Sequence, residues 1–98
     1  MSKATTIIKD QDVFTLIRGE FNAEDALEIV THVIRKKIRF HEMRNLSEQI
    51  RYGAGDEASL KRIGELNESL EAFRKLAEEA KATGRPIKLE SSIKADLV

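Results

Sequence analysis

No cysteine occurs among the 98 residues, so disulfide bonds, thiolate zinc sites and cysteine nucleophiles are all excluded. No apolar run approaches the roughly 20 residues that a membrane-spanning helix needs. The opening residues 1–6 hold no apolar segment of signal-peptide length. We therefore expect a cytoplasmic protein with no membrane partner.

An excess of charge of one sign is also missing, because 17 basic residues balance 17 acidic ones. General nucleic-acid binders usually carry an excess of lysine and arginine, so the balance disfavours nucleic acid as a partner. What the sequence does contain is charge of both signs, on 35% of its residues. A chain this short builds only a modest core, which makes self-association a reasonable expectation.

The first long amphipathic pattern predicts a helix over about residues 23–52. Asn22 is its expected N-cap. In the first half, the apolar residues fall on one side at 100° per residue: Ala26, Leu27, Val30, Val33, Ile34 and Ile38. Farther along, the same side becomes polar, with Lys37, His41, Asn45 and Glu48. Either the helix bends near Asn45, or a second surface covers the apolar residues that now point the other way: Met43, Leu46 and Ile50.

The second pattern predicts a helix over about residues 57–83. Gly53 ends the first helix, Asp56 caps the second, and Gly84 ends it. The apolar residues of the second helix keep heptad spacing and form a coiled-coil seam: Ile63, Leu66, Leu70, Phe73, Ala77 and Ala80. Residues 53–58 superficially match a dinucleotide-binding fingerprint. However, a helix precedes them where that motif requires a strand, so we predict no cofactor.

Extended segments flank the two helices. Residues 5–18 are rich in strand formers and predict either a β-hairpin, with a turn at residues 10–12, or one bent strand; we prefer the hairpin. Residues 86–97 alternate apolar and charged side chains, as in a strand with one wet face. The predicted fold class is α+β in the order β-β-α-α-β, as a single domain of residues 1–98. Its terminal strands form a small antiparallel sheet against the roots of a long antiparallel helical hairpin.

A short loop centred on Ala54 would place facing residues of the two helices at numbers summing to roughly 109. His41 would then lie near Asn67 and Glu68, and Asn45 near Gly64. A cluster of His41, Asn45 and Glu48 with these residues, on the inward face of the helix, suggests a ligand site or a general base. The alternative, which we favour, is a polar layer that fixes the helix register.

A basic run lies on the first helix: Arg35, Lys36, Lys37, Arg39 and Arg44. It suggests a phosphate-binding helix, but the same register sets it opposite Glu65, Glu68 and Glu71. We therefore favour a solvated face with interhelical ion pairs. Glu28 and His32, four residues apart, supply too few ligands for a metal. We interpret them as a surface pair and predict no metal site.

Residues 37–66 contain a set of short motifs: Lys37-Ile-Arg-Phe-His41, Asn45-Leu-Ser47, Arg51-Tyr-Gly53, Asp56 and Leu60-Lys-Arg-Ile63. In these motifs the chain resembles a family of small, functionally uncharacterised bacterial proteins. The resemblance implies a helical hairpin preceded by a short strand, and it implies no activity. It does make the hairpin tip the distinctive region.

The function that these patterns favour is a non-enzymatic interaction or structural module, acting as a homo-oligomer, with a dimer preferred. No catalytic residue is predicted. The candidate interaction tip consists of His41, Asn45, Glu48, Arg51, Asp56 and Arg62. The candidate oligomer surface consists of Met43, Leu46, Ile50, Ile63, Leu66, Leu70 and Phe73. An unidentified protein partner, nucleic-acid binding through residues 35–44, and a small enzyme or metal site around His41 stay open as alternatives.

Overall fold

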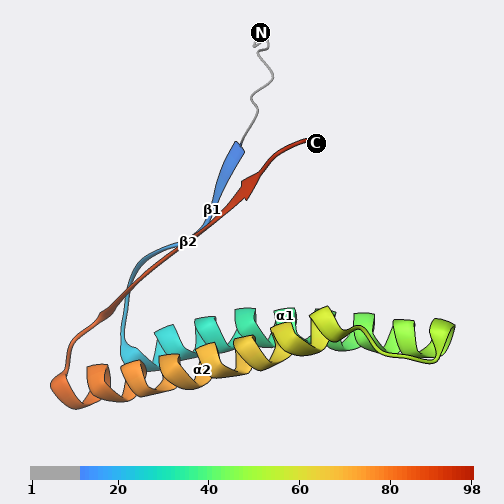
Figure 1. Ribbon diagram of the computed structural model, residues 1–98. Helices are drawn as coiled ribbons and strands as arrows, with labels where there is room; N and C mark the ends of the chain where they lie inside the picture. The colour runs from blue at the N-terminus through green and yellow to red at the C-terminus, as the bar shows by residue number, and fades with distance from the viewer. Residues whose placement is uncertain (1–11) are drawn as a thin grey trace, which may run out of the picture. The chain divides into compact units, whose positions relative to one another are not determined.

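The computed structural model describes residues 12–98 and has two strands and two helices in the order β1-α1-α2-β2 (Figure 1). The predicted α+β class, with a helical hairpin and a small antiparallel sheet, is confirmed. The additional strand predicted near residue 5 and its turn at residues 10–12 lie outside, or at the edge of, the described residues. The chain divides into two compact units, a helical hairpin over Phe21–Ile87 and a strand pair made by residues 12–20 and Lys88–Val98.

The strand pair is a two-stranded antiparallel ribbon formed by β1 (Asp12–Phe21) and β2 (Ile87–Ala95). The side chains of Arg18 and Glu90 form an ion pair at 3.8 Å. In β2 the predicted alternation appears as a buried Ile87 followed by half-buried Leu89 and Ser91. Ile93 in the same series is exposed, so the ribbon buries little apolar surface of its own.

Local sequence signals fix the ends of both helices. α1 spans Ala23–Tyr52, and the side chain of Asn22 accepts a hydrogen bond from the backbone N–H of Asp25 at 2.7 Å. α2 spans Glu57–Thr83, with Asp56 as its N-cap. Gly53 and Gly84 follow the helices at φ 75° and 68°, a left-handed conformation that glycine adopts at little cost.

The hairpin core follows the heptad seam of α2. Leu66, Leu70, Ala77 and Ala80 are buried, and Ile63 and Phe73 are half-buried. On α1, Ala26 is fully buried, and the half-buried residues Val30, Ile34 and Ile38 continue its side of the helix. The predicted seam therefore packs within one chain, and it joins α1 to α2.

The predicted register of the two helices is wrong. His41 contacts Ser59, and Asn45 contacts Asp56, so facing residues sum to about 100 rather than 109. The cause is the path of the loop, which runs back along α1 instead of turning at its end. A Cβ atom added to Gly55 would collide with the Asn45 amide oxygen, which shows how closely the loop passes. The last turns of α1, residues 46–52, consequently extend beyond the start of α2 (Figure 1).

Candidate functional site

A polar cluster joins the two helices where α2 begins. His41, Asn45 and Glu48 are half-buried on the side of α1 that faces α2, whereas Lys37 is exposed. From α2 the cluster receives Ser59, which is 2% exposed. Asn67 and Glu68, predicted as neighbours of His41, are exposed and lie two turns farther along α2. Ser59 takes their place because of the shift in register.

Hydrogen bonds link the members of this cluster in a chain. The Asp56 backbone N–H donates to the Asn45 side-chain oxygen at 2.8 Å, and the Ser59 hydroxyl donates to Asp56 Oδ2 at 2.9 Å. The Ser59 oxygen lies 3.3 Å from His41 Nδ1. Because its own proton points to Asp56, Ser59 accepts from His41, which assigns the imidazole proton to Nδ1. His41 Nε2 is buried and has no hydrogen-bond partner among residues 12–98.

The Asp56 carboxylate is the anionic centre of the cluster. The hydrogen bond from the Ser59 hydroxyl is the main cause that lowers the pKa of Asp56 below its ordinary value of 3.8. Partial burial opposes this shift, while the backbone N–H groups of Ser59 and Ala58 and the charge of Arg44 reinforce it. The Arg44 guanidinium lies 3.4 Å from Asp56 Oδ2. These contacts keep the carboxylate ionised as the cap of α2.

The order of the cluster is unsuited to nucleophilic catalysis. The Ser59 proton is directed to the carboxylate and not to the imidazole, so His41 is not placed to take it. Ser59 is also closed off from solvent. Within residues 12–98, no group of three or more His, Cys, Asp or Glu side chains is placed to hold a metal ion. The arrangement ties the cap of one helix to the facing helix.

The tip residues predicted from the sequence come together only in part. His41, Asn45 and Asp56 belong to one cluster. Arg62 instead pairs with Glu65 on its own helix at 3.0 Å. Arg51 lies exposed in the last turn of α1. Sequence reasoning missed Ser59, although its place three residues after the Asp56 cap is a known capping position.

The ion pairs predicted between the basic run and Glu65, Glu68 and Glu71 are absent from the part of the chain that the structure describes. Glu65 and Glu71 pair with Arg62 and Arg74 inside α2. Arg44 pairs with Asp56, and the Lys37 ammonium lies 4.9 Å from the centroid of the Phe40 ring. The prediction is wrong for Arg35, Lys36 and Arg39, which are exposed and form no ion pair within residues 12–98.

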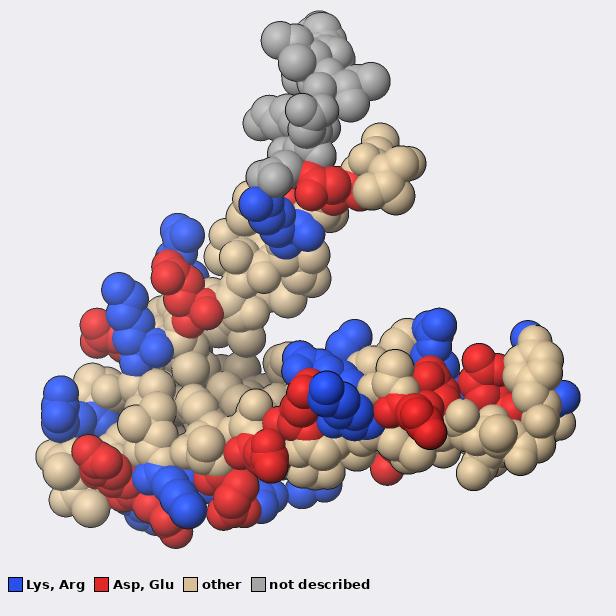
Figure 2. All heavy atoms as spheres, viewed as in Figure 1, with Lys and Arg blue, Asp and Glu red and all other residues tan. Residues whose placement is uncertain are grey.

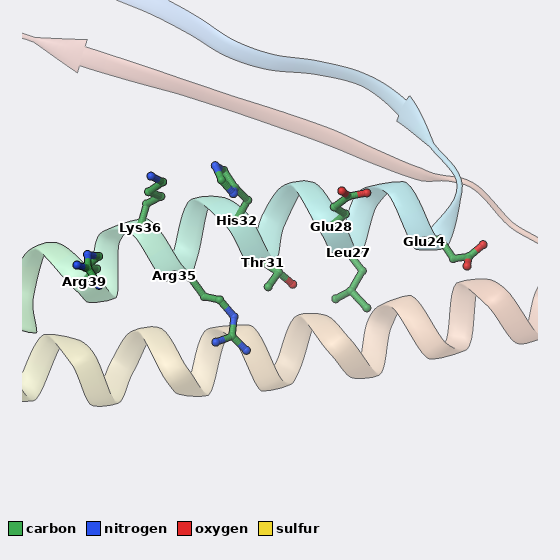
Figure 3. Close-up of a pocket in the computed structure, with 8 residues that line it drawn as sticks. All are labelled: Glu24, Leu27, Glu28, Thr31, His32, Arg35, Lys36 and Arg39. Carbon is green, nitrogen blue, oxygen red and sulfur yellow. The ribbon is translucent and has the colours of Figure 1, made fainter.

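These exposed basic residues line one shallow groove of about 690 Å³ along α1 (Figure 3). Its lining residues are Glu24, Leu27, Glu28, Thr31, His32, Arg35, Lys36 and Arg39. Glu28 and His32, predicted to pair with each other, both line it, and no ion pair joins them. The groove is acidic toward the start of α1 and basic toward its middle. Over the hairpin as a whole, Figure 2 shows acidic and basic groups interspersed.

Beyond the groove, the outer side of α1 becomes apolar. Met43, Leu46 and Ile50 are 54%, 46% and 76% exposed. We call these three residues the apolar end of α1. They belong to the surface predicted for oligomerisation, whereas Leu66 and Leu70 of the same predicted surface are buried against α1 in the single chain. Within residues 12–98, no helix combines the length and apolar character needed to cross a bilayer.

Comparison of the chain with protein families, with curated proteins and with solved structures finds no match. Candidate functions therefore rest on the residues themselves.

Proposed function

We propose that the chain is a non-enzymatic structural or interaction module that self-associates through the outer side of α1. The observation that supports this is the apolar end of α1, formed by Met43, Leu46 and Ile50. These side chains lie opposite the side that packs on α2. Leu46 and Ile50 lie on the segment that extends past the start of α2. Three neighbouring aliphatic side chains in water carry a free-energy cost that burial against a second copy would remove.

The physical chemistry of the rest of the surface agrees with a module of this kind. The polar cluster around Ser59 is closed, and it satisfies a helix cap instead of presenting a reactive group. The charges on the outer side of α1 are exposed and of both signs, so a second copy can meet them with charges of opposite sign. A dimer is the simplest assembly that covers the outer side of α1, because two-fold symmetry brings the same helix together from each chain.

Measuring the mass in solution across a wide concentration range tests the proposal. The wild-type chain should move from monomer to dimer as concentration rises. A Leu46→Gln/Ile50→Gln double variant should stay monomeric at concentrations where the wild type is dimeric. Leu76→Gln is the matched control, because Leu76 is 49% exposed on the distant part of α2. A wild-type chain that is monomeric throughout would contradict self-association and turn the search toward a different protein partner.

A second candidate function is binding of a nucleic-acid backbone by Arg35, Lys36 and Arg39. The observation that favours it is that these side chains line one groove and lack the ion pairs expected from the sequence. Binding of a labelled 20-nucleotide single strand or duplex should then weaken steeply between 50 and 200 mM salt, by about tenfold or more. An Arg35→Glu/Arg39→Glu variant should lose the binding. Absence of binding at low salt would remove this candidate.

A further inference from the structure

The groove on α1 has the form of a helix-docking site. Its lining residues form two rows at four-residue spacing, one of Glu24, Glu28, His32 and Lys36 and the other of Leu27, Thr31, Arg35 and Arg39. Figure 3 shows Glu28, His32 and Lys36 on one side of the helix and Leu27, Thr31 and Arg35 on the other. Rows of this spacing are the ridges between which the side chains of a second helix pack. The sixteen positions from Glu24 to Arg39 span about 24 Å of helix.

The charges in this groove reverse sign about its centre. Glu24 and Glu28 lie in the first half, and Arg35 and Arg39 lie at the mirror positions in the second half. The centre falls between Thr31 and His32, and every lining residue has a counterpart at an equal distance on the other side. If the groove of a second copy is placed antiparallel on the groove of the first, each acidic residue of one copy lies opposite a basic residue of the other.

Leaving His32 aside, the groove has five charged residues, and none of them forms an ion pair within residues 12–98. These residues are Glu24, Glu28, Arg35, Lys36 and Arg39. A polyanion would satisfy the basic half and be repelled by the acidic half. An antiparallel copy of α1 satisfies both halves, and this makes a second copy the occupant that the charge pattern favours.

We propose that two copies of the chain pair through this groove, α1 against α1 and antiparallel, with the two-fold axis between Thr31 and His32. Glu24 then faces Arg39 and Glu28 faces Arg35 of the other copy, and each pair occurs twice. The proposal rests on the self-association proposed above and adds its orientation and register. In this register the apolar end of each copy is centred about 22 Å from the axis and extends past the start of α1 of the other copy.

The charge pairs set the direction of pairing more than its strength. Exposed ion pairs contribute little free energy each, but like charges placed opposite one another disfavour the wrong arrangement. In a parallel dimer in register, Glu28 would face Glu28 and Arg35 would face Arg35. Met43 continues the row of Arg39 by one further step of four, so the groove and the apolar end of α1 form one continuous outer surface.

Charge reversal with complementation tests the register. The basic variant carries Glu24→Lys and Glu28→Lys, and the acidic variant carries Arg35→Glu and Arg39→Glu. Each variant alone should dimerise about tenfold or more weakly than the wild type, because like charges then face each other. An equimolar mixture should form a heterodimer at least as tightly as the wild type self-associates, which native mass spectrometry distinguishes by mass. Thermal melts of the dilute variants check that each one folds.

The possible outcomes separate this inference from the proposed function. If the charge variants dimerise as the wild type does while Leu46→Gln/Ile50→Gln does not, self-association stands and the groove pairing is wrong. If all variants and the wild type are monomeric, and the mixture is monomeric too, both are wrong. If each charge variant is monomeric by itself and only their mixture dimerises, the proposed register is supported.

Single cysteines test the direction independently, because the native sequence has none. His32→Cys lies next to the axis and should form an intermolecular disulfide readily on mild oxidation. Glu24→Cys should not cross-link to itself, since the two thiols would be about 22 Å apart along the helix. Cross-linking of both variants would instead indicate a parallel pair and overturn the proposal. Ser69→Cys, exposed on α2, measures the background of random collisions.

Discussion

The two sides of α1 differ in how many interactions their side chains make within a single chain. The inner side packs on α2 and ends in a polar cluster whose members are tied by hydrogen bonds at 2.8–3.3 Å. The outer side has charges without ion pairs in the described residues and three aliphatic side chains that are 46–76% exposed. The requirements of folding explain the inner side. The outer side contributes little to the folding of one chain, and this is why we place function there.

Truncating the seam should have the largest effect on stability. Leu70→Ala removes a side chain that is 4% exposed, and we expect the free energy of unfolding to fall by about 2–4 kcal/mol. Urea titration followed by circular dichroism measures the change. Leu76→Ala on the same helix, at 49% exposure, serves as the control and should cost much less. Equal losses in the two variants would mean that the seam is not the core.

A smaller loss is expected from breaking the link that sets the register. Asn45→Ala removes the acceptor for the Asp56 backbone N–H, which should cost about 1–2 kcal/mol. The same titration measures it, with Asn67→Ala, an exposed position on α2, as the control. If both variants are as stable as the wild type, the loop does not depend on Asn45.

Acid should weaken the inner side through Asp56. Its pKa in the folded chain lies below the ordinary 3.8, so the carboxylate stabilises the fold above that pH. This contribution disappears as pH falls below 3.8 toward the lower folded-state value. Thermal melts from pH 6 to pH 2.5 should show a gap between the wild type and Asp56→Asn that narrows in this range. If the difference in melting temperature between the two proteins does not change with pH, the charge of the Asp56 carboxylate is not the cause of the stabilisation.

The smallest effect is expected on the outer side. Met43→Gln should change the free energy of unfolding of the dilute monomer by less than about 0.5 kcal/mol, because Met43 is 54% exposed. Chemical denaturation at low micromolar concentration measures this. A loss comparable to that of Leu70→Ala would abolish the contrast between the two sides.

The helix ends and the seam could be predicted because they depend on local chemistry. Asn22, Gly53, Asp56 and Gly84 each act through backbone groups within a few residues. The heptad spacing of the apolar residues is enough to identify the inward side of α2. These signals need no knowledge of the other helix.

The register could not be predicted because it depends on a contact between the helices. The loop runs back along α1 to reach the Asn45 amide, and nothing in residues 53–55 specifies that path. The error moved His41 away from Ser59, which left the cluster incomplete and placed the acids of α2 opposite the basic run. Ser59 was within reach of local reasoning, as the residue that completes the Asp56 cap.

The extension of α1 past the start of α2 has a consequence for local unfolding. Residues 46–52 form about two turns without a facing helix, and so short a helix gains little stability from its own backbone hydrogen bonds. Opening of this segment therefore costs less than opening of the seam, and its amide protons should exchange with solvent sooner. Leu46 and Ile50 lie on this segment. Binding at this end would raise the local protection of the backbone as well as cover the side chains.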